Sequence, residues 1–180
     1  MIYENIQEEL QILKQLPEPV VTWFRANKRE LPWRDHPDAY RVWVSEIMLQ
    51  QTRVEAVKSY YHRFLEALPD VKALAEAEED QLLKLWEGLG YYNRVRNMQK
   101  AATQIMVDYG GEFPQTYEEI LNLTGIGSYT AGAISSFAYG LAKPAVDGNV
   151  LRVISRITGS DRDIMKQSVR KRMETLLEQV

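Results

Sequence analysis

The 180-residue sequence contains no cysteine and only two histidines, His36 and His62. The absence of cysteine excludes disulfide bonds, thiolate metal sites and a cysteine nucleophile within these residues. Two scattered histidines are too few for a metal site built on imidazole ligands. No apolar run of about eighteen residues is present to span a membrane, and the first residues lack the basic and apolar regions of a signal peptide. These absences favour a cytoplasmic protein.

The sequence also lacks alternating runs rich in valine and isoleucine, internal repeats and low-complexity segments. Nearly every apolar run instead has the spacing of an amphipathic helix. The 45% of apolar residues can fill one domain, or two small lobes that share a core. We therefore predict an all-α fold.

The net charge of −3 argues at first against nucleic acid, but the charges are segregated along the chain. Residues 66–87 carry seven acids against two lysines, and residues 150–172 carry seven bases against two aspartates. Such runs are usually solvated helix faces, and we assign most of these residues that role. The basic run follows directly on a motif suited to phosphate binding, so it is also a candidate for contacts with nucleic acid.

That motif lies in residues 116–149, where helical segments 116–122 and 128–139 flank Leu-Thr-Gly-Ile-Gly at 123–127. The first segment begins with the capping box Thr116-x-x-Glu119, and the two glycines make a tight turn in which positive φ is inexpensive. Backbone N–H groups and a positive helix end therefore converge on the turn and can bind a phosphate. The candidate phosphate contacts are Gly125, Gly127, Ser128 and Arg152.

Further helices are expected at residues 5–28, interrupted near Pro17 and Pro19, and at 42–51, 52–68, 70–76, 80–87 and 95–109. A capping box at Thr52 separates the helix at 42–51 from the helix at 52–68, and a single unbroken helix over both ranges is the alternative. The pattern is still helical at residue 180 without a cap, which predicts that the sequence is part of a longer chain. Buried positions are expected at Val20, Val21, Trp23, Phe24, Trp43 and Trp86.

Glu46 is the candidate general acid. Its neighbours one helical turn away are Val42, Trp43, Leu49 and Gln50, which are mostly apolar. Poor hydration of the charged form should raise its pKa above the ~4.3 of free glutamate, so that the carboxyl can donate a proton near neutral pH. The alternative is a glutamate that points outward at the edge of the apolar stripe.

Asp147 is the candidate anion, at the predicted start of a helix. An ordinary helix N-cap is the commonest role for an aspartate there. Backbone N–H groups that hold a capping carboxylate also favour its ionised form. A neutral acid paired with an anion is the combination that cleavage of a glycosidic bond requires.

Four motifs occur in order: Ser-Glu-Ile-Met-Leu-Gln-Gln-Thr at 45–52, Gly-Leu-Gly-Tyr-Tyr-Asn-Arg at 88–94, the hairpin, and Val-Asp-Gly-Asn-Val-Leu-Arg at 146–152. Together they resemble the catalytic domain of the adenine DNA glycosylase (MutY) family, from about Trp23 onward. The resemblance implies a helix-hairpin-helix DNA glycosylase fold, with a six-helix barrel-like lobe and part of a second helical lobe. We expect residues 1–28 in the second lobe, 29–140 in the catalytic lobe with the hairpin at 116–139, and 141–180 in the Asp147 loop and the start of the second lobe.

The resemblance also implies residue roles in removing adenine mispaired with 8-oxoguanine or guanine. Glu46 would protonate the flipped adenine on its five-membered ring, and Asp147 would stabilise the sugar cation by charge or through a transient covalent bond. Asn149 would orient Asp147. The adenine pocket would be lined by Arg29, Leu31, Trp33 and Arg34. Gln51 and Tyr91 would form a wedge in the duplex. Thr52 and Leu89 would approach the 8-oxoguanine. Plain core packing is the alternative for Trp33, Leu89 and Tyr91, but Trp33 and Tyr91 are expected to be exposed.

Tyr129 separates two reaction types, and we count it with the catalytic residues for that reason. Endonuclease III-like relatives carry a lysine here, whose amine can form a Schiff base and cut the strand. Tyr129 cannot, so a monofunctional hydrolase is predicted. The alternatives are an endonuclease III-like pyrimidine glycosylase and lyase, a non-catalytic helix-hairpin-helix DNA-binding module, and a helical interaction domain that does not bind DNA.

The resemblance extends to cofactors and partners. Family members usually carry a four-cysteine 4Fe-4S cluster and a further 8-oxoguanine-recognition domain beyond this region, and this sequence has neither. The hairpin is a possible site for a sodium or potassium ion. Duplex DNA is the expected partner of a monomeric protein at the bacterial nucleoid.

Overall fold

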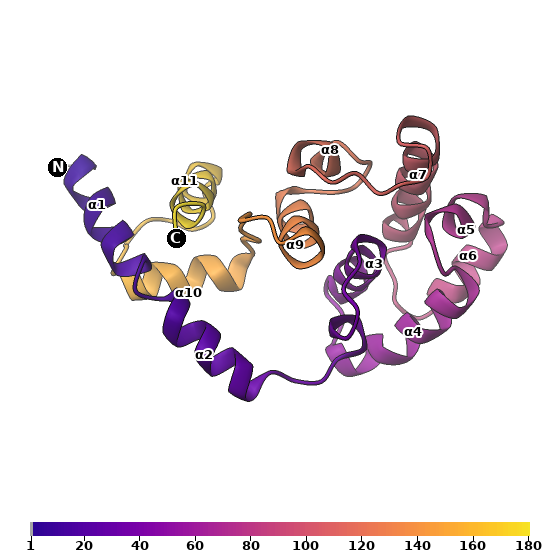
Figure 1. Ribbon diagram of the computed structural model, residues 1–180, viewed down its shortest axis with the longest axis horizontal. Helices are drawn as coiled ribbons and strands as arrows, with labels where there is room; N and C mark the ends of the chain where they lie inside the picture. The colour runs from indigo at the N-terminus through magenta and orange to yellow at the C-terminus, as the bar shows by residue number, and fades with distance from the viewer. Residues whose placement is uncertain (1) are drawn as a thin grey trace. The chain divides into compact units, whose positions relative to one another are not determined.

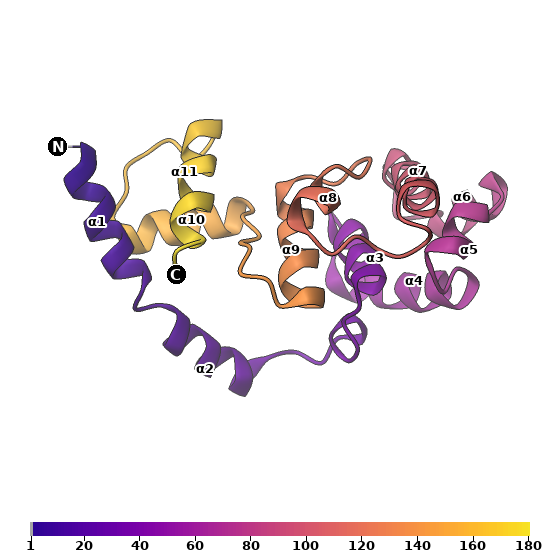
Figure 2. The same ribbon diagram turned by 45° about the horizontal axis from the view of Figure 1, so that its top comes forward.

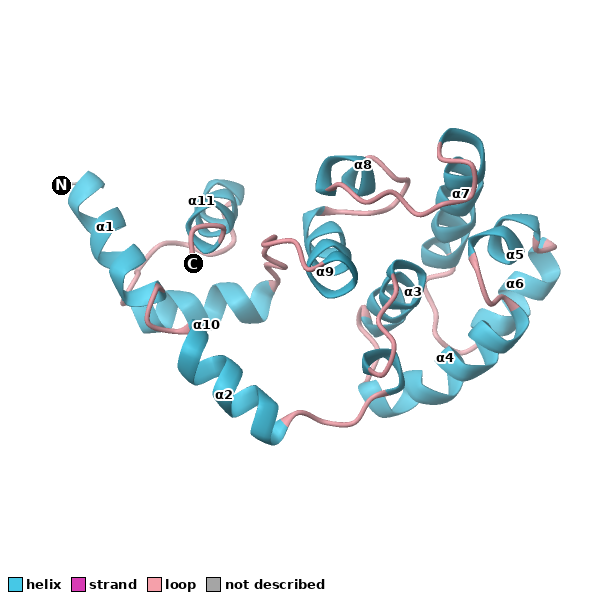
Figure 3. Cartoon of the chain, viewed as in Figure 1, coloured by secondary structure: helices cyan, strands magenta, loops and turns pink. Residues whose placement is uncertain are grey.

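The computed structural model describes residues 2–180, with side chains from Ile6 onward, and this part of the chain is helical without a strand (Figure 3). Met1, the first residue of the stretch tested for a signal peptide, lies outside it. None of the helices of residues 2–180 is long and apolar enough to cross a membrane. The helices are α1 (Ile2–Leu13), α2 (Pro17–Asn27), the 3-10 helix η1 (Pro32–Arg34), α3 (Ala39–Leu49), α4 (Val54–Ala67), α5 (Val71–Glu76), α6 (Glu79–Trp86), α7 (Asn93–Asp108), α8 (Tyr117–Leu121), α9 (Ser128–Tyr139), α10 (Gly148–Thr158) and α11 (Gln167–Leu177).

The chain forms two compact units. The central unit is Leu31–Lys143, and the terminal unit combines Met1–Glu30 with Pro144–Val180. The sequence predicts boundaries at 28/29 and 140/141, and the chain crosses between the units at 30/31 and 143/144. Each unit has its own hydrophobic cluster.

In the central unit, α3 is the most deeply buried helix of the site. Eight of its eleven residues are buried, and α4 and α9 pack against it (Figure 1). Both views place α8 beside α9, so that the predicted hairpin is attached to the core through α9 (Figure 2). Trp43 and Trp86 are completely enclosed, as predicted. The core of this unit therefore positions both α3 and the hairpin.

In the central unit, the predicted helix cap at Thr116 is confirmed and the one at Thr52 is wrong. Asp70 accepts a hydrogen bond from the Ala73 N–H at 2.8 Å, and the Thr116 hydroxyl accepts one from the Glu119 N–H at 3.3 Å. Thr52 caps nothing, because its hydroxyl donates to the Gln50 carbonyl at 3.3 Å and α4 starts two residues later. A single helix through this region is also excluded, since Gln51 has a left-handed φ of 59°.

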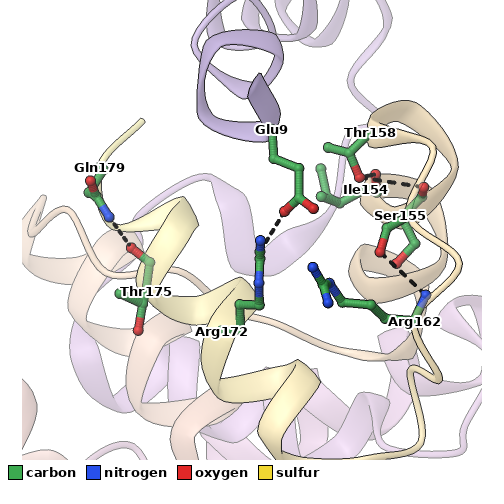
Figure 4. Close-up of polar contacts among 9 residues, drawn as sticks. Glu9, Ile154, Ser155, Thr158, Arg162, Arg172, Thr175 and Gln179 are labelled. Atoms are coloured by element: carbon green, nitrogen blue, oxygen red, sulfur yellow. Dashed lines mark hydrogen bonds and ion pairs between the residues drawn. The ribbon is translucent and has the colours of Figure 1, made fainter. Parts of the chain in front are cut away.

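The terminal unit contains α1, α2, α10 and α11, and its core is formed by α1, α10 and α11 together with Val146. Its small core consists of leucines, Val146, Ile154 and Met173. Glu9 of α1 is 4% exposed and forms an ion pair with Arg172 of α11, and Figure 4 shows Arg162 reaching toward the same place. This buried contact joins the N-terminal helix to the C-terminal segment.

The apolar face of α2 is not buried, which corrects the prediction. Val20, Val21, Trp23 and Phe24 are 56%, 42%, 64% and 41% exposed, and α2 has no buried residue. The cause is tertiary, because the core of the terminal unit is completed by α1, α10 and α11 without α2. Helical periodicity predicts which residues share a face, but not whether another element covers it.

Candidate DNA-repair active site

Glu46 lies on α3 and is partly buried. Val42 and Trp43, one turn before it, are 3% and 1% exposed, while Gln50, one turn after it, is exposed. The carboxyl therefore sits where the buried part of α3 meets the surface. A carboxyl in this position has apolar neighbours on one side and access to a ligand on the other.

Two exposed turns lie at the end of α3 and before α7, and each contains a residue with left-handed backbone. Gln51 has φ 59° and Tyr91 has φ 49°, and they are the two non-glycine residues with positive φ between residues 2 and 180. That conformation costs an L-residue roughly 1–2 kcal/mol. The Tyr91 side chain is 68% exposed, whereas the neighbouring Leu89 is 7% exposed. Of the predicted DNA-wedge and 8-oxoguanine contacts, Gln51 and Tyr91 are thus accessible, Thr52 is half-buried and Leu89 is enclosed.

Arg94, at the start of α7, connects these two turns. Its Nη1 donates to the carbonyl oxygens of Ile47 and Gln50, both at 2.7 Å. Its Nη2 donates to the carbonyl oxygens of Leu89 and Gly90, at 3.0 and 3.2 Å. Burial lowers the pKa of the Arg94 guanidinium. An arginine remains charged in proteins even so, so that these hydrogen bonds are charge-assisted.

The turn of the hairpin fits closely against α7. Gly125 has φ +78°, and a Cβ added to it would lie 2.8 Å from the Cβ of Asn97. The Thr124 N–H donates to the Gln104 side chain at 3.2 Å. Gly127 differs from the prediction, because its φ of −100° is open to any residue and no atom lies within 4 Å of an added Cβ. Only the first glycine of the motif therefore needs to be glycine for the shape of the turn.

The start of α9 carries Ser128 and Tyr129, which are both half-buried. Its N-cap is Gly127, whose lack of a side chain leaves the helix end open to an external ligand. The same helix packs against α3, which carries Glu46. The candidate phosphate-binding end of the hairpin and the candidate acid therefore belong to two helices in direct contact.

The predicted adenine-pocket residues lie around the chain crossing between the two units. Arg29 is exposed in the terminal unit, and Leu31, Trp33 and Arg34 lie at the start of the central unit. The expected exposure of Trp33 is wrong, since its side chain is 8% exposed and packs edge-on against Tyr61 with ring centroids 5.5 Å apart. The 3-10 turn of η1 directs the Trp33 side chain into the core. Leu31 is also buried, at 4% exposure, whereas Arg34 is exposed.

In the terminal unit, Asp147 is the N-cap of α10, as predicted. Its Oδ1 accepts from the Val150 N–H at 2.8 Å, and its Oδ2 accepts from the Asn149 side-chain amide at 3.0 Å. The preceding residue, Val146, is buried, and its carbonyl oxygen accepts from Arg170 Nη1 at 2.8 Å. Arg152 is exposed on the same helix. The carboxylate is thus held on both oxygens, and the backbone before it is held by an arginine.

A metal or cluster site is not formed by these residues. Among the residues that the structure describes, no group of three or more His, Cys, Asp or Glu side chains could hold a metal ion. An iron–sulfur cluster needs cysteine thiolates, and the sequence contains none. The residues present therefore do not fit a 4Fe-4S cluster.

Comparison with known proteins identifies the class of this fold and site. The model of the HhH-GPD superfamily of base excision DNA repair proteins matches residues 44–179, and the chain belongs to this superfamily. It is 39% identical over 162 residues to the adenine DNA glycosylase of Buchnera aphidicola from Acyrthosiphon pisum, covering 89% of this chain and 46% of that protein. It is 41% identical over 170 residues to the human adenine DNA glycosylase, covering 89% of this chain and 31% of that protein. The chain thus spans less than half the length of these relatives.

A solved structure supports the same fold. A trapped endonuclease III–DNA covalent intermediate superposes with a TM-score of 0.76 at 25% identity, covering 93% of this chain and 76% of that chain. The predicted helix-hairpin-helix glycosylase fold and the resemblance to adenine DNA glycosylases are therefore confirmed.

Several residues that hold the site are not identified by any sequence pattern as functional. Asn97 and Gln104 support the hairpin turn, Arg170 supports the Asp147 loop, and Arg94 supports both exposed turns. Arg94 lies within the motif at 88–94 and Arg170 within the basic run at 150–172. Asn97 and Gln104 occupy ordinary helical positions, and no pattern in the sequence marks them.

Proposed function

We propose that this protein is a monofunctional adenine DNA glycosylase that removes adenine mispaired with 8-oxoguanine or guanine in duplex DNA. The observation that carries the proposal is the contrast between two carboxyls. Glu46 sits at the edge of a buried helix, whereas Asp147 accepts hydrogen bonds from a backbone N–H and from Asn149. An acid for the leaving base and an anion for the sugar are what N-glycosidic cleavage needs.

In the proposed reaction, the adenine leaves the base stack and Glu46 donates a proton to a nitrogen of its five-membered ring. The bond between the base and C1′ then breaks, and its electron pair leaves with the protonated base. Asp147 stabilises the positive charge that develops on the sugar. Water adds to C1′ and gives up a proton to the Glu46 or Asp147 carboxylate. The products are free adenine and an abasic site in an uncut strand.

In the proposal, one set of residues receives the flipped base and another set fills its place in the stack. Arg29 and Arg34 are exposed and would contact the flipped base, with Leu31 and Trp33 forming an apolar floor. Gln51 and Tyr91 would enter the vacated space, which offsets part of the few kcal/mol that flipping costs. Thr52 and Leu89 would approach the 8-oxoguanine. Phosphate contacts are assigned to the hairpin turn at Gly125, Gly127 and Ser128 and to Arg152.

Several parts of the proposal rest on family likeness. The protein would act as a monomer on chromosomal DNA in the cytoplasm. A 4Fe-4S cluster and a domain that recognises 8-oxoguanine would be supplied by sequence outside residues 1–180. A sodium or potassium ion would bind the hairpin carbonyls. No step of the proposed reaction depends on these additions.

One assay separates the proposal from its alternatives. Duplex DNA with adenine opposite 8-oxoguanine is incubated with the protein in excess, and half of each sample is then treated with alkali. Scission only after alkali is expected, because an abasic site is alkali-labile. Scission before alkali would favour an endonuclease III-like glycosylase and lyase instead.

Controls complete the assay. A duplex with cytosine in place of the adenine should remain intact under both treatments. Binding without scission would leave a non-catalytic helix-hairpin-helix module, and absence of binding would contradict every reading that involves DNA. Because phosphate contacts contribute to affinity, binding should weaken steeply as salt rises.

A further inference from the structure

The strained backbone at Gln51 and Tyr91 is not explained by burial. Both residues are exposed, and they lie forty positions apart in different turns. An exposed residue in the left-handed region persists only where surrounding contacts impose it. The contact common to both turns is the Arg94 guanidinium.

The hydrogen bonds of Arg94 end on the peptide groups that lead into the two strained residues. The Gln50 carbonyl belongs to the peptide unit that contains the Gln51 nitrogen, and the Gly90 carbonyl to the unit that contains the Tyr91 nitrogen. Because a peptide group is planar, fixing its carbonyl also fixes the direction of the next N–H, and thus one of the two planes between which the following φ is measured. One planar side chain thereby restrains both residues.

Additional contacts hold the guanidinium itself. It lies 5.4 Å from the centroid of the Trp86 ring and 5.8 Å from that of the Tyr91 ring. The Trp86 indole N–H donates to the same Gly90 carbonyl at 3.1 Å. Trp86 is fully buried, so that Arg94 ties the exposed turns to the core.

We propose that Arg94 is the positioning residue of the DNA wedge, holding Gln51 and Tyr91 in one preformed arrangement before DNA is bound. This inference rests on the proposed function for the meaning of the wedge. Lysine cannot replace Arg94, because a single ammonium lacks the planar fork that reaches four carbonyl oxygens on two segments. Preforming the wedge lowers the cost of base flipping, since neither residue has to be ordered during the reaction.

The substitution Arg94→Lys can be accommodated. Arg94 lines a cavity of about 190 Å³ together with Gln50, Asn97 and Thr124, so the shorter side chain meets open space and not a clash. The matched control is Arg96→Lys, two positions along the same helix, where the guanidinium makes a surface ion pair with Glu79 at 2.9 Å.

The first measurement is amide hydrogen exchange of the protein without DNA. Arg94→Lys should accelerate exchange in segments 50–52 and 89–92 by about tenfold or more, as expected for losing charge-assisted hydrogen bonds, while Arg96→Lys leaves it unchanged. Unchanged exchange in Arg94→Lys would overturn the proposal. This readout requires no activity, so it stays decisive if the proposed glycosylase function fails.

The second measurement is the single-turnover rate of base release from two duplexes. One carries adenine opposite 8-oxoguanine, and the other carries adenine opposite an abasic site, where little stacking must be replaced. Arg94→Lys should lose about tenfold or more on the first and little on the second, because only the first needs the wedge. An equal loss on both duplexes would indicate a merely structural role and overturn the proposal.

A third measurement avoids substitution, in case Arg94→Lys does not fold. Backbone order parameters of Gln51 and Tyr91 in the unsubstituted protein should match those of rigid helix, about 0.85. Values below about 0.6, the range of flexible backbone, would overturn the proposal.

Discussion

The side-chain amide of Asn149 donates a hydrogen bond to Oδ2 of Asp147 over 3.0 Å. The Val150 N–H donates to the other carboxylate oxygen, Oδ1. The two hydrogen bonds together fix the orientation of the carboxylate, and Asn149 supplies the only one of them that comes from a side chain. We expect Asn149→Ala to lower the single-turnover rate of base release about tenfold, as the loss of one charge-assisted hydrogen bond predicts. DNA affinity and the melting temperature should change little, because the cap contact with Val150 remains. A rate equal to that of the unsubstituted protein would show that Asp147 needs no orienting partner.

The hairpin turn offers a matched pair of glycine substitutions. Gly125→Ser places a Cβ against Asn97 at a φ of +78° and should lower the free energy of unfolding by about 1–3 kcal/mol. Gly127→Ser adds the same side chain at an extended N-cap position with open space, where serine is well tolerated. Urea denaturation of both variants measures the difference. Equal losses of stability would contradict the distinct roles assigned to the two glycines.

Local signals in the sequence were sufficient for the hairpin. Residues 128–139 were predicted as a helix and form α9, and Thr116 caps α8, because caps and glycine turns are determined by residues next to one another. The same reasoning placed Asp147 correctly at the start of α10. The helix caps at Thr116 and Asp147 and the hairpin turn were predicted correctly because they depend on contacts within about one helical turn.

The errors in burial involve partners distant in the sequence, whereas the error at Thr52 is local. The apolar face of α2 and the side chain of Trp33 were assigned the wrong exposure, because burial is decided by elements that periodicity does not identify. The capping-box pattern predicts a cap at Thr52, but the left-handed backbone at Gln51 ends α3 and the Thr52 hydroxyl donates to the Gln50 carbonyl. Arg94 contacts a carbonyl 44 residues away and Arg170 one 24 residues away, and neither contact leaves a local pattern.

Tyr129 offers a test of the reaction type by gain of function. Tyr129→Lys introduces an amine that can attack the aldehyde of the abasic product at C1′, with loss of water, to form a Schiff base that cuts the strand. We expect scission without alkali and a covalent protein–DNA complex after borohydride reduction. Phe137→Lys adds the same amine at a position on α9 that is 62% exposed, and it should leave the unsubstituted behaviour unchanged. Absence of a complex with Tyr129→Lys would show that this position does not face the sugar.

Removing one partner of the Glu9–Arg172 ion pair should destabilise the protein strongly. The side chains are 5% and 21% exposed, and Glu9→Ala would leave the largely buried arginine without this partner. Breaking a buried pair in this way typically costs about 3–5 kcal/mol. The control is Glu87→Ala, which breaks an exposed pair with Lys84 and should cost less than about 1 kcal/mol. Equal shifts in the denaturation midpoints of the two variants would contradict the role of Glu9 in joining α1 to α11.

The division of labour between Glu46 and Asp147 is tested most directly by single-turnover base release from duplex DNA with adenine opposite 8-oxoguanine. Glu46→Gln, Asp147→Asn and the double substitution are compared with the unsubstituted chain at protein concentrations that saturate binding. We predict that each single substitution slows base release by about a hundredfold or more while leaving binding intact, and that the double substitution adds little further, because the two groups act in one step. Base release by either single variant at the rate of the unsubstituted chain would contradict the account.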